Sequence, residues 1–222
     1  MQGDFLIGEP RGVIGVDEAG KGDYFGPLVI AACFSDKDIE GQLLASGLKE
    51  SKRVSDSRAF ALEKIVKRLA PHEVVVIGPE KYNELHSKIK NLNKLLAWGH
   101  SRALENLLVR VNPGEVISDQ FGSKNLIENA LLARGRRVKL TQMTKAESIT
   151  AVAAASILAR AEFLRRLAAL GEHFGVILPK GAGSIVDEAG RKFVAARGAG
   201  ELKRAAKLHF RNSGRVIGGS AH

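Results

Sequence analysis

The sequence predicts an α/β fold, in which a mixed central sheet is flanked by helices and followed by a C-terminal helical segment. Three observations support this. Two β-branched runs near the start of the chain are close enough to pair as a hairpin. Later runs of the same kind alternate with segments of helical spacing, which indicates helices packed on a sheet. Residues 171–222 show only loop and helical patterns. We therefore expect a single domain over 1–222, with a short irregular lead-in at 1–12.

Five apolar or alternating runs are predicted to be strands. The run at 13–17 is β-branched and the run at 28–34 is apolar throughout, so these two are expected to form the hairpin. The other three are 74–77, 116–118 and 137–141, and the last of them alternates like a half-exposed strand.

Leucine and alanine spacing predicts the helices. Ser57 is a suitable N-cap for a helix over 58–70, which Pro71 would end, and Ser123 is a suitable N-cap for a helix over 126–131. The remaining expected helices are a short one around 43–48, a long one over 92–107, an alanine-rich one over 145–170, and two near 187–197 and 200–208.

Composition limits the classes of function. The chain has 222 residues, 45% of them hydrophobic and 26% charged, which is typical of a globular protein. Its net charge of +10 favours a polyanionic partner such as nucleic acid, although solubility alone would also account for it. The single cysteine, Cys33, excludes an internal disulfide and lies in an apolar run where we expect it to be buried.

The compartment and the assembly follow from what the sequence lacks. Residues 1–5 carry neither the basic start nor the apolar run of a signal peptide, and nothing reaches membrane-spanning length. We therefore expect a cytoplasmic protein that does not contact a membrane. The six histidines are scattered without the close pairing of a zinc site. Nothing in the sequence demands more than a monomer.

Residues 13–27 combine a strand, two carboxylates and a glycine loop. Asp17 and Glu18 follow the strand, and Gly20-Lys21-Gly22 offers bare backbone and one positive charge to a phosphate. An ordinary solvated turn is one alternative. A P-loop is another, but Gly22 replaces the Ser or Thr that would bind Mg²⁺, and the two carboxylates would repel a polyphosphate. We therefore expect no nucleotide cofactor.

Two further acids, Asp119 and Glu147, extend this pattern. Asp119 follows the strand at 116–118, so Asp17, Glu18 and Asp119 would meet at one sheet edge if the two strands are parallel neighbours. Clustered acids repel one another unless cations lie between them, and Mg²⁺ and Mn²⁺ prefer oxygen ligands. The alternatives are that Asp119 starts a turn and that Glu147 complements a helix dipole.

Six segments, taken together, resemble the type 2 ribonucleases H. They cover residues from about 12 to 212 in the family's order, and they look most similar to bacterial ribonuclease HIII. The segments are 13–27, Glu50-Ser51-Lys52, Ser118-Asp119-Gln120-Phe121, 144–160, 178–182 and Lys207-Leu208-His209-Phe210.

The resemblance implies a ribonuclease H-like fold and a specific chemistry. It makes Asp17, Glu18, Asp119 and Glu147 catalytic residues that bind two divalent ions, Mg²⁺ or Mn²⁺. It implies hydrolysis of the RNA strand of RNA/DNA hybrids, leaving 5′-phosphate and 3′-hydroxyl ends. Substrate contacts are expected from Gly20, Lys21, Gly22, Lys52 and Lys180.

Two basic tracts are consistent with a nucleic-acid partner. The first contains five cations and no acid: Arg134, Arg136, Arg137, Lys139 and Lys145. The second, within 191–215, has one acid, Glu201, and eight cations: Arg191, Lys192, Arg197, Lys203, Arg204, Lys207, Arg211 and Arg215. A solvated helix face usually mixes charges of both signs, so we expect a nucleic-acid-binding face here.

Details of the motifs favour the HIII type over the HII type. Ribonuclease HII uses a tyrosine in the second half of the chain to cut at single embedded ribonucleotides, and the only tyrosines here are Tyr24 and Tyr82. Lys21, Gln120-Phe121 and Glu147 match the HIII pattern. HII-like cleavage and a catalytically silent hybrid-binding module are the alternatives. Ribonuclease HIII typically has an N-terminal accessory domain, and we expect this chain to be the catalytic part without it.

Overall fold

A computed structural model describes residues 12–48, 55–119 and 124–218 of the chain. Its centre is a five-stranded sheet in the order β3-β2-β1-β4-β5. The strands are β1 (Val13–Ala19), β2 (Leu28–Ser35), β3 (His72–Ile77), β4 (Glu115–Asp119) and β5 (Lys139–Met143). The β1-β2 and β2-β3 pairs are antiparallel, whereas β1-β4 and β4-β5 are parallel. The predicted mixed sheet and its early hairpin are confirmed.

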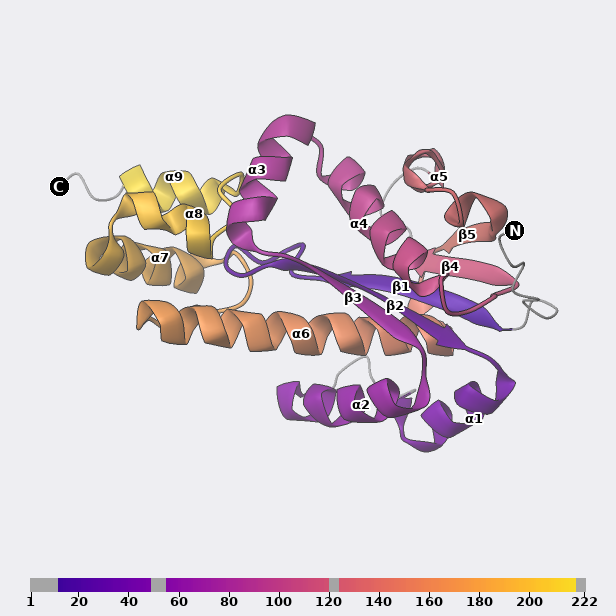
Figure 1. Cartoon of the computed structure of the whole chain (residues 1–222). Helices are drawn as coiled ribbons and strands as arrows, with labels where there is room; N and C mark the ends of the chain where they lie inside the picture. The colour runs from indigo at the N-terminus through magenta and orange to yellow at the C-terminus, as the bar shows by residue number, and fades with distance from the viewer. Residues whose placement is uncertain (1–11, 49–54, 120–123, 219–222) are drawn as a thin grey trace.

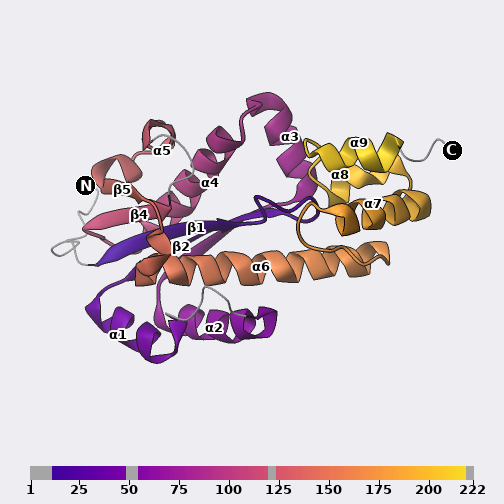
Figure 2. The ribbon, with the colours of Figure 1, turned by 180° about the vertical axis from the view of Figure 1, so that it is seen from behind.

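Helices cover both faces of the sheet (Figure 1). On one face lies α4 (Leu92–Leu107), with α3 (Pro79–Ile89) and α5 (Lys124–Ala130) beside it. On the other face α6 (Thr150–Phe174) packs directly on the strands, with α1 (Lys37–Ala45) and α2 (Asp56–Leu69) on the same side, as the view from behind also shows (Figure 2).

The C-terminal segment forms a separate group of helices at one end of the sheet, next to α3 (Figure 1). It contains α7 (Ser184–Arg197), the short α8 (Leu202–Ala205) and α9 (Arg211–Gly218). Short 3-10 turns occur at η2 (Gly135–Arg137), η3 (Ala146–Ser148) and η4 (Ala199–Glu201). The predicted C-terminal helical segment is thus present.

The core consists of two large clusters, one on each face of the sheet. Because side chains alternate along a strand, β2 sends Val29, Ala31 and Cys33 toward α6 and Leu28 and Ile30 toward α4. Every residue of β2 is buried, as expected for a strand covered on both faces. Cys33 is free and buried, as predicted.

Some predicted boundaries are wrong. Ser55, not Ser57, caps α2, and its hydroxyl accepts the N–H of Arg58. The alanine-rich helix begins at Thr150 rather than near 145, because Lys145 has a left-handed backbone (φ 58°) and the 3-10 turn η3 follows it. Helices α3 and α9 were not predicted. The predicted N-cap Ser123 lies outside the described residues.

A close approach of α6 to β1 explains one glycine and the alanine-rich helix. A Cβ added to Gly15 would lie 2.1 Å from the backbone nitrogen of Val152 and 2.5 Å from the carbonyl oxygen of Ala151. Both neighbours are backbone atoms of α6 and cannot rotate away, so only glycine allows this packing. The small side chains of Ala151 and Ala155 are fully buried on the same helix. The β1-α6 contact therefore requires small residues on both sides.

We predict that Gly15→Ala destabilises the protein by about 3 kcal/mol, because the new methyl group would overpack a rigid backbone contact. Gly41→Ala is the matched control, since a Cβ at Gly41 in α1 meets no atom within 4 Å. That change should stabilise the protein by about 0.5 to 1 kcal/mol, because alanine is the better helix former. Urea unfolding of both variants measures these effects. Equal stability of the Gly15→Ala variant and the wild type would contradict the packing described.

Candidate active site

The pairing of β1 with β4 places Asp17 next to Asp119. The two strands are parallel and in register from Val13 with Glu115 to Val16 with Ser118, so Asp17 and Asp119 are the next pair in that register. Neighbouring strands lie about 4.8 Å apart, and residues paired in register point to the same face. The expectation that these two strands are parallel neighbours with their acids at one edge is confirmed.

Asp17 faces α6. It accepts a hydrogen bond from the side chain of Ser156, one helical turn beyond Val152, and from the N–H of Glu18 at 2.8 Å. Burial and the negative charge of Glu18 together raise the pKa of Asp17 from 3.8 to about 6, although both hydrogen bonds oppose the rise. The folded protein therefore holds this carboxylate in an environment that disfavours its charge.

Glu18 faces the opposite layer. Its Oε2 lies 3.0 Å from Nε2 of His100 on α4, and the Nδ1 of that imidazole is 3.3 Å from the hydroxyl of Ser118. The Nζ of Lys21 lies 3.3 Å from the other carboxylate oxygen. Burial alone would raise the pKa of Glu18, but the hydrogen bond from His100 and the charges of His100 and Lys21 outweigh it and hold the pKa below its usual value. Glu18 is thus stabilised as a carboxylate.

His100 is a residue that the sequence did not suggest. Its side chain is 2% exposed, and it connects Glu18 on β1 to Ser118 on β4, whose hydroxyl also contacts the carbonyl oxygen of Asp119. Because its partners are far apart in sequence, no spacing pattern could have identified it. His100 thus links the polar side chains of Glu18 and Ser118 on the α4 face of the sheet.

The fourth predicted acid can be placed only by its backbone. Glu147 lies in η3, and the N–H of the preceding residue, Ala146, donates to Asp119 Oδ1 at 3.3 Å. The backbone of Glu147 is therefore adjacent to the Asp119 carboxylate, on the α6 face. The side chain of Glu147 is outside the described part of the structure.

The glycine loop after β1 uses its two glycines differently. Gly20 is buried with φ +85°, and a Cβ there would lie 2.2 Å from the carbonyl oxygen of Pro27, so the fold itself requires glycine. Gly22 is exposed, and a Cβ there would meet no atom within 4 Å. Lys21, 39% exposed in its side chain, lies between them and reaches back to Glu18. Gly22 is the point where main chain is open to a ligand.

The acids fit a divalent cation by their chemistry. Asp17, Glu18 and Asp119 supply carboxylate oxygens, the donors that Mg²⁺ and Mn²⁺ prefer, at a strand end where negative charge is only partly compensated. Among the residues that the structure describes, no three acids, histidines or cysteines are already close enough to hold an ion. Strand alternation explains this, since Asp17 and Glu18 point to opposite faces.

The other predicted substrate contacts have mixed outcomes. Lys52 lies outside the described residues. Lys180 is half exposed, and its Nζ forms an ion pair with Asp56 at 2.7 Å. The loop that carries Lys180 is joined to the glycine loop, because Tyr24 N–H donates to Gly181 O at 2.9 Å and Gly181 N–H donates to Asp23 Oδ1 at 2.6 Å. Asp23 therefore has a structural role that the sequence did not reveal.

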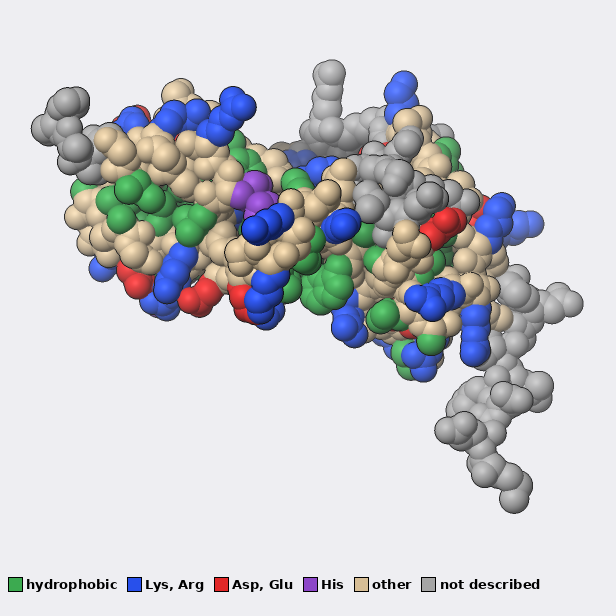
Figure 3. Space-filling view, turned by 90° about the horizontal axis from the view of Figure 1, so that it is seen from above, with side chains coloured by type: hydrophobic (Ala, Val, Ile, Leu, Met, Phe, Trp, Pro, Cys, Tyr) green, Lys and Arg blue, Asp and Glu red, His purple; other side chains and the backbone are tan. Residues whose placement is uncertain are grey.

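The basic tracts differ from expectation in one respect. Lys207 was counted in the second tract, but its side chain is fully buried, so its assignment to an exposed face is wrong. Two of the exposed cations in that tract pair with acids just before it in sequence, Lys192 with Glu188 and Arg215 with Asp187. Lys and Arg side chains are spread over the whole face seen from above (Figure 3). The surface stays positive, although less uniformly than the sequence suggested.

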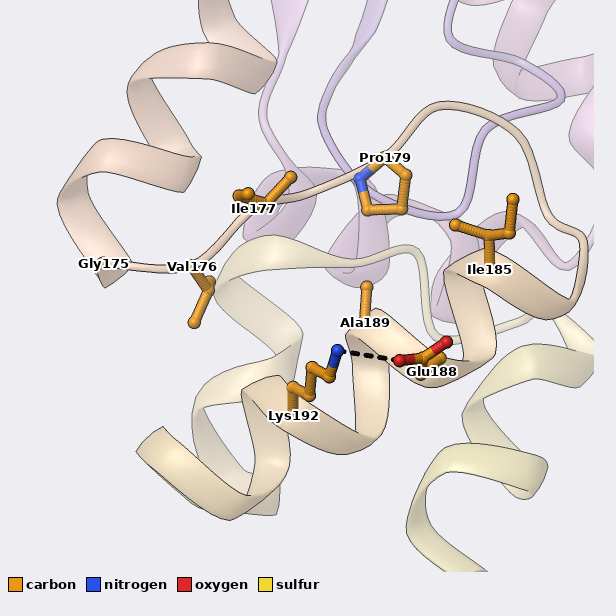
Figure 4. A pocket seen from close by; sticks show the side chains of 8 residues that line it. All are labelled: Gly175, Val176, Ile177, Pro179, Ile185, Glu188, Ala189 and Lys192. Atoms are coloured by element: carbon orange, nitrogen blue, oxygen red, sulfur yellow. Dashed lines mark ion pairs between the residues drawn. The ribbon is translucent and has the colours of Figure 1, made fainter.

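A hollow of about 430 Å³ lies away from these acids. Ile177 and Pro179, on the chain after α6, face Ile185 and Ala189 on α7, with the Glu188-Lys192 ion pair at its rim (Figure 4). Its lining is mainly apolar and includes none of the predicted site residues. It therefore offers no groups for the chemistry that the acids suggest.

No helix in the described parts of the chain combines the length and apolarity needed to span a bilayer.

Comparison with known proteins gives a consistent result. A sequence profile of the family described as Ribonuclease HII matches residues 14–213. The chain is 40% identical over 205 residues to the ribonuclease HIII of Protochlamydia amoebophila, and the matched region covers 92% of this chain and 68% of that protein. It is 38% identical over 220 residues to the ribonuclease HIII of Bacillus velezensis, which covers 95% and 70%.

Solved structures agree with the sequence comparison. The crystal structure of Bst-RNase HIII in complex with Mn²⁺ superposes with a TM-score of 0.88 at 33% identity, over 97% of this chain and 71% of that chain. The ribonuclease H2 from Pyrococcus horikoshii OT3 superposes with a TM-score of 0.80 at 23% identity, over 95% and 99%, and shares the fold.

We predict that Asp17→Asn stabilises the metal-free protein at pH 7.5 by about 3 kcal/mol, because the pKa of Asp17 is raised from 3.8 to about 6 and one pKa unit corresponds to about 1.4 kcal/mol. The pKa of about 6 in the folded protein lies above the ordinary value of 3.8, so the cost of ionised Asp17 is complete above pH 6 and disappears below pH 4. The difference in the free energy of unfolding between the variant and the wild type should therefore vanish below pH 4. Urea unfolding in EDTA at pH 4, 5, 6 and 7.5 measures it.

Asp56→Asn is the control with the opposite sign. The ion pairs with Lys180 and Arg160 lower the pKa of Asp56, so this variant should lose stability at pH 7.5 relative to the wild type. A flat difference between Asp17→Asn and the wild type across the pH range would contradict the electrostatic strain assigned to Asp17.

Proposed function

This chain belongs to the ribonuclease HII family, and we propose that its ribonuclease H activity is carried by Asp17, Glu18, Asp119 and Glu147. The enzyme hydrolyses RNA in RNA/DNA hybrids, as its relatives named ribonuclease HIII indicate. The observation that carries the site assignment is the parallel β1-β4 pair, which sets Asp17 and Asp119 side by side at the strand ends.

The proposed division of labour follows from the two faces of the sheet. Asp17 and Asp119 share the α6 face with the backbone of Glu147, whereas Glu18 approaches from the α4 face. We assign Asp17 and Asp119 as the ligands that both metal ions share. Glu18 and Glu147 would each bind one of the two ions. Two bound Mg²⁺ or Mn²⁺ ions would supply an activated water and stabilise the leaving 3′ oxygen. The products would carry 5′-phosphate and 3′-hydroxyl ends.

The protein's own contribution is to hold these carboxylates ready. Ser156 and the N–H of Glu18 orient Asp17, and His100 orients Glu18 from below. Burial and, to a smaller extent, the negative charge of Glu18 raise the pKa of Asp17, and this cost of ionisation gives the site a preference for cations before substrate arrives. The crystal structure of the similar Bst-RNase HIII in complex with Mn²⁺ supports a divalent cofactor.

Recognition of the RNA strand is assigned to the glycine loop. RNA differs from DNA by its 2′-hydroxyl, which proteins sense by close contacts in the wide, shallow minor groove. Gly22 leaves the main chain open for such a contact, and Lys21 places a cation within reach of both a phosphate and Glu18. We also propose Lys52 and Lys180 as phosphate contacts. We propose that the protein is a monomer.

We predict that Asp119→Asn lowers cleavage of a labelled RNA/DNA hybrid by at least about a thousandfold, because it removes one negative oxygen donor from the shared position. Single-turnover assays with Mg²⁺ and with Mn²⁺ measure the loss, with duplex RNA and duplex DNA as substrates that the wild type should leave intact. Glu73→Gln is the control, because this acid lies on β3 and pairs with Arg110 instead. A variant that retains a tenth of the wild-type rate would overturn the assignment of Asp119.

Cleavage at a single embedded ribonucleotide is the second candidate activity. Tyr24 and Tyr82, the only tyrosines, are both buried, so neither is available to stack on an RNA–DNA junction. We predict that hybrids with four or more consecutive ribonucleotides are cut at least about a hundredfold faster than a DNA duplex with one. Efficient nicking of the single-ribonucleotide duplex would instead indicate HII-type activity.

A further inference from the structure

The loop between β1 and β2 is joined to two distant parts of the chain. The segment that follows α8 forms an isolated bridge between Phe25 and Ala206, Gly26 N–H donates to Ala205 O, and Lys207 N–H donates to Tyr24 O at 2.8 Å. On its other side the loop is bonded to Gly181, as described above. The loop thus lies between two segments of the chain and is hydrogen-bonded to both.

Lys207 lies at the centre of this arrangement. Its side chain is fully buried, and its Nζ lies 2.7 Å from the carbonyl oxygen of Asp23, 2.7 Å from that of Gly26 and 3.3 Å from that of Phe25. An ammonium group has three N–H donors, so three backbone carbonyls of one loop use all of them. Each bond to a charged donor is stronger than a neutral one.

Burying the charged amino group of a lysine costs free energy, so a buried lysine needs hydrogen-bond partners that compensate for this cost. Burial lowers the pKa of Lys207 to about 7, and the charge of Asp23 only partly opposes this. A methionine or leucine would fill the same space without that cost, but neither could donate hydrogen bonds to the loop carbonyls that Lys207 contacts.

The segment that carries Lys207 is itself anchored. Asn83 on α3 donates from Nδ2 to the carbonyl oxygens of Lys203 and Ala206, and its Oδ1 accepts the N–H of Leu208. These bonds fix the backbone on either side of Lys207. The loop is consequently held against a segment that is itself hydrogen-bonded to α3.

We propose that Lys207 is a positioning residue for RNA recognition, which fixes the main chain of the Gly20–Gly26 loop through Asp23, Phe25 and Gly26. The inference rests on the proposed role of this loop in binding the hybrid. A loop with Gly20, Gly22 and Gly26 has much conformational entropy to lose, and two of these glycines have φ above +80°. Ordering the loop before substrate arrives increases affinity without any direct contact from Lys207.

The test compares Lys207→Met with Lys203→Met. Both substitutions remove one lysine from the same segment, but the side chain of Lys203 is exposed and only its carbonyl binds Asn83. Fluorescence anisotropy in EDTA measures binding to a labelled RNA/DNA hybrid and to a DNA duplex of the same sequence. Initial rates with Mn²⁺ separate KM from kcat.

Lys207→Met should weaken hybrid binding at least tenfold and raise KM similarly, while kcat at saturation changes less than threefold. Binding to the DNA duplex should change less than threefold, so that the preference for the hybrid falls. Lys203→Met removes one surface charge of the second basic tract, so it should weaken binding to the hybrid and to the DNA duplex equally and leave the preference for the hybrid unchanged.

Two further variants separate positioning from general destabilisation. Glu63→Gln weakens the ion pairs of Glu63 with Lys67 within α2 and with Arg165 on α6. It should leave hybrid preference unchanged even if its Tm falls as far as that of Lys207→Met. Asn83→Ala loosens the anchored segment while Lys207 stays in place, and it should reduce hybrid preference. This second variant keeps the inference testable if Lys207→Met does not fold.

Unchanged hybrid preference in Lys207→Met, or in Asn83→Ala when Lys207→Met does not fold, would overturn the inference. An equal loss in Glu63→Gln would overturn it as well, because the effect would then be one of stability. Failure of the wild type to cut the hybrid would instead count against the proposed function.

Discussion

The parallel pairing of β1 with β4 is the constraint on which the site depends. Asp17 and Asp119 are far apart in sequence, and the register of the two strands sets them side by side. A shift of that register by one residue would turn Asp119 to the opposite face. On the same face, α6 approaches β1 so closely at Gly15 that a Cβ there would clash with backbone atoms of the helix. Glycine in β1 thus lets α6 pack directly against the strand that carries Asp17.

The same arrangement creates the electrostatic strain that a metal site needs. Asp17 is buried beside another carboxylate, and its pKa is raised, whereas that of Glu18 is lowered by His100 and Lys21. Two adjacent acids thus have opposite shifts because strand alternation gives them different neighbours. One carboxylate is held charged by the protein, and the other is stabilised as a charged group only when a cation joins it. Stability in the absence of metal is reduced by the feature that favours metal binding.

The sequence predicted the sheet well because its signals are local. Strands β1 to β4 are short apolar runs between turn residues, and Asp17, Glu18 and Asp119 could be placed at strand ends by counting along those runs. His100 could not be predicted in this way. It lies within α4, and its partners on β1 and β4 are 82 and 18 residues away in sequence. Helix α3 was missed because its apolar residues are few and its start, at Pro79, also fits a turn.

Lys207 shows where charge patterning fails as a guide. A run of cations in sequence indicates a basic surface only if each side chain points outward, and a lysine has enough reach to turn inward and bind carbonyls instead. In the second tract the surface cations are partly neutralised by acids on α7 and at Glu201, while the fully buried one binds the glycine loop. Thus the conformation of the loop depends on a residue more than 180 positions later in the chain, and loop and C-terminal segment form a single structural unit. The two proposed tasks therefore rest on different elements, because β1 and β4 position the acids and the C-terminal segment holds the loop to which we assign RNA recognition.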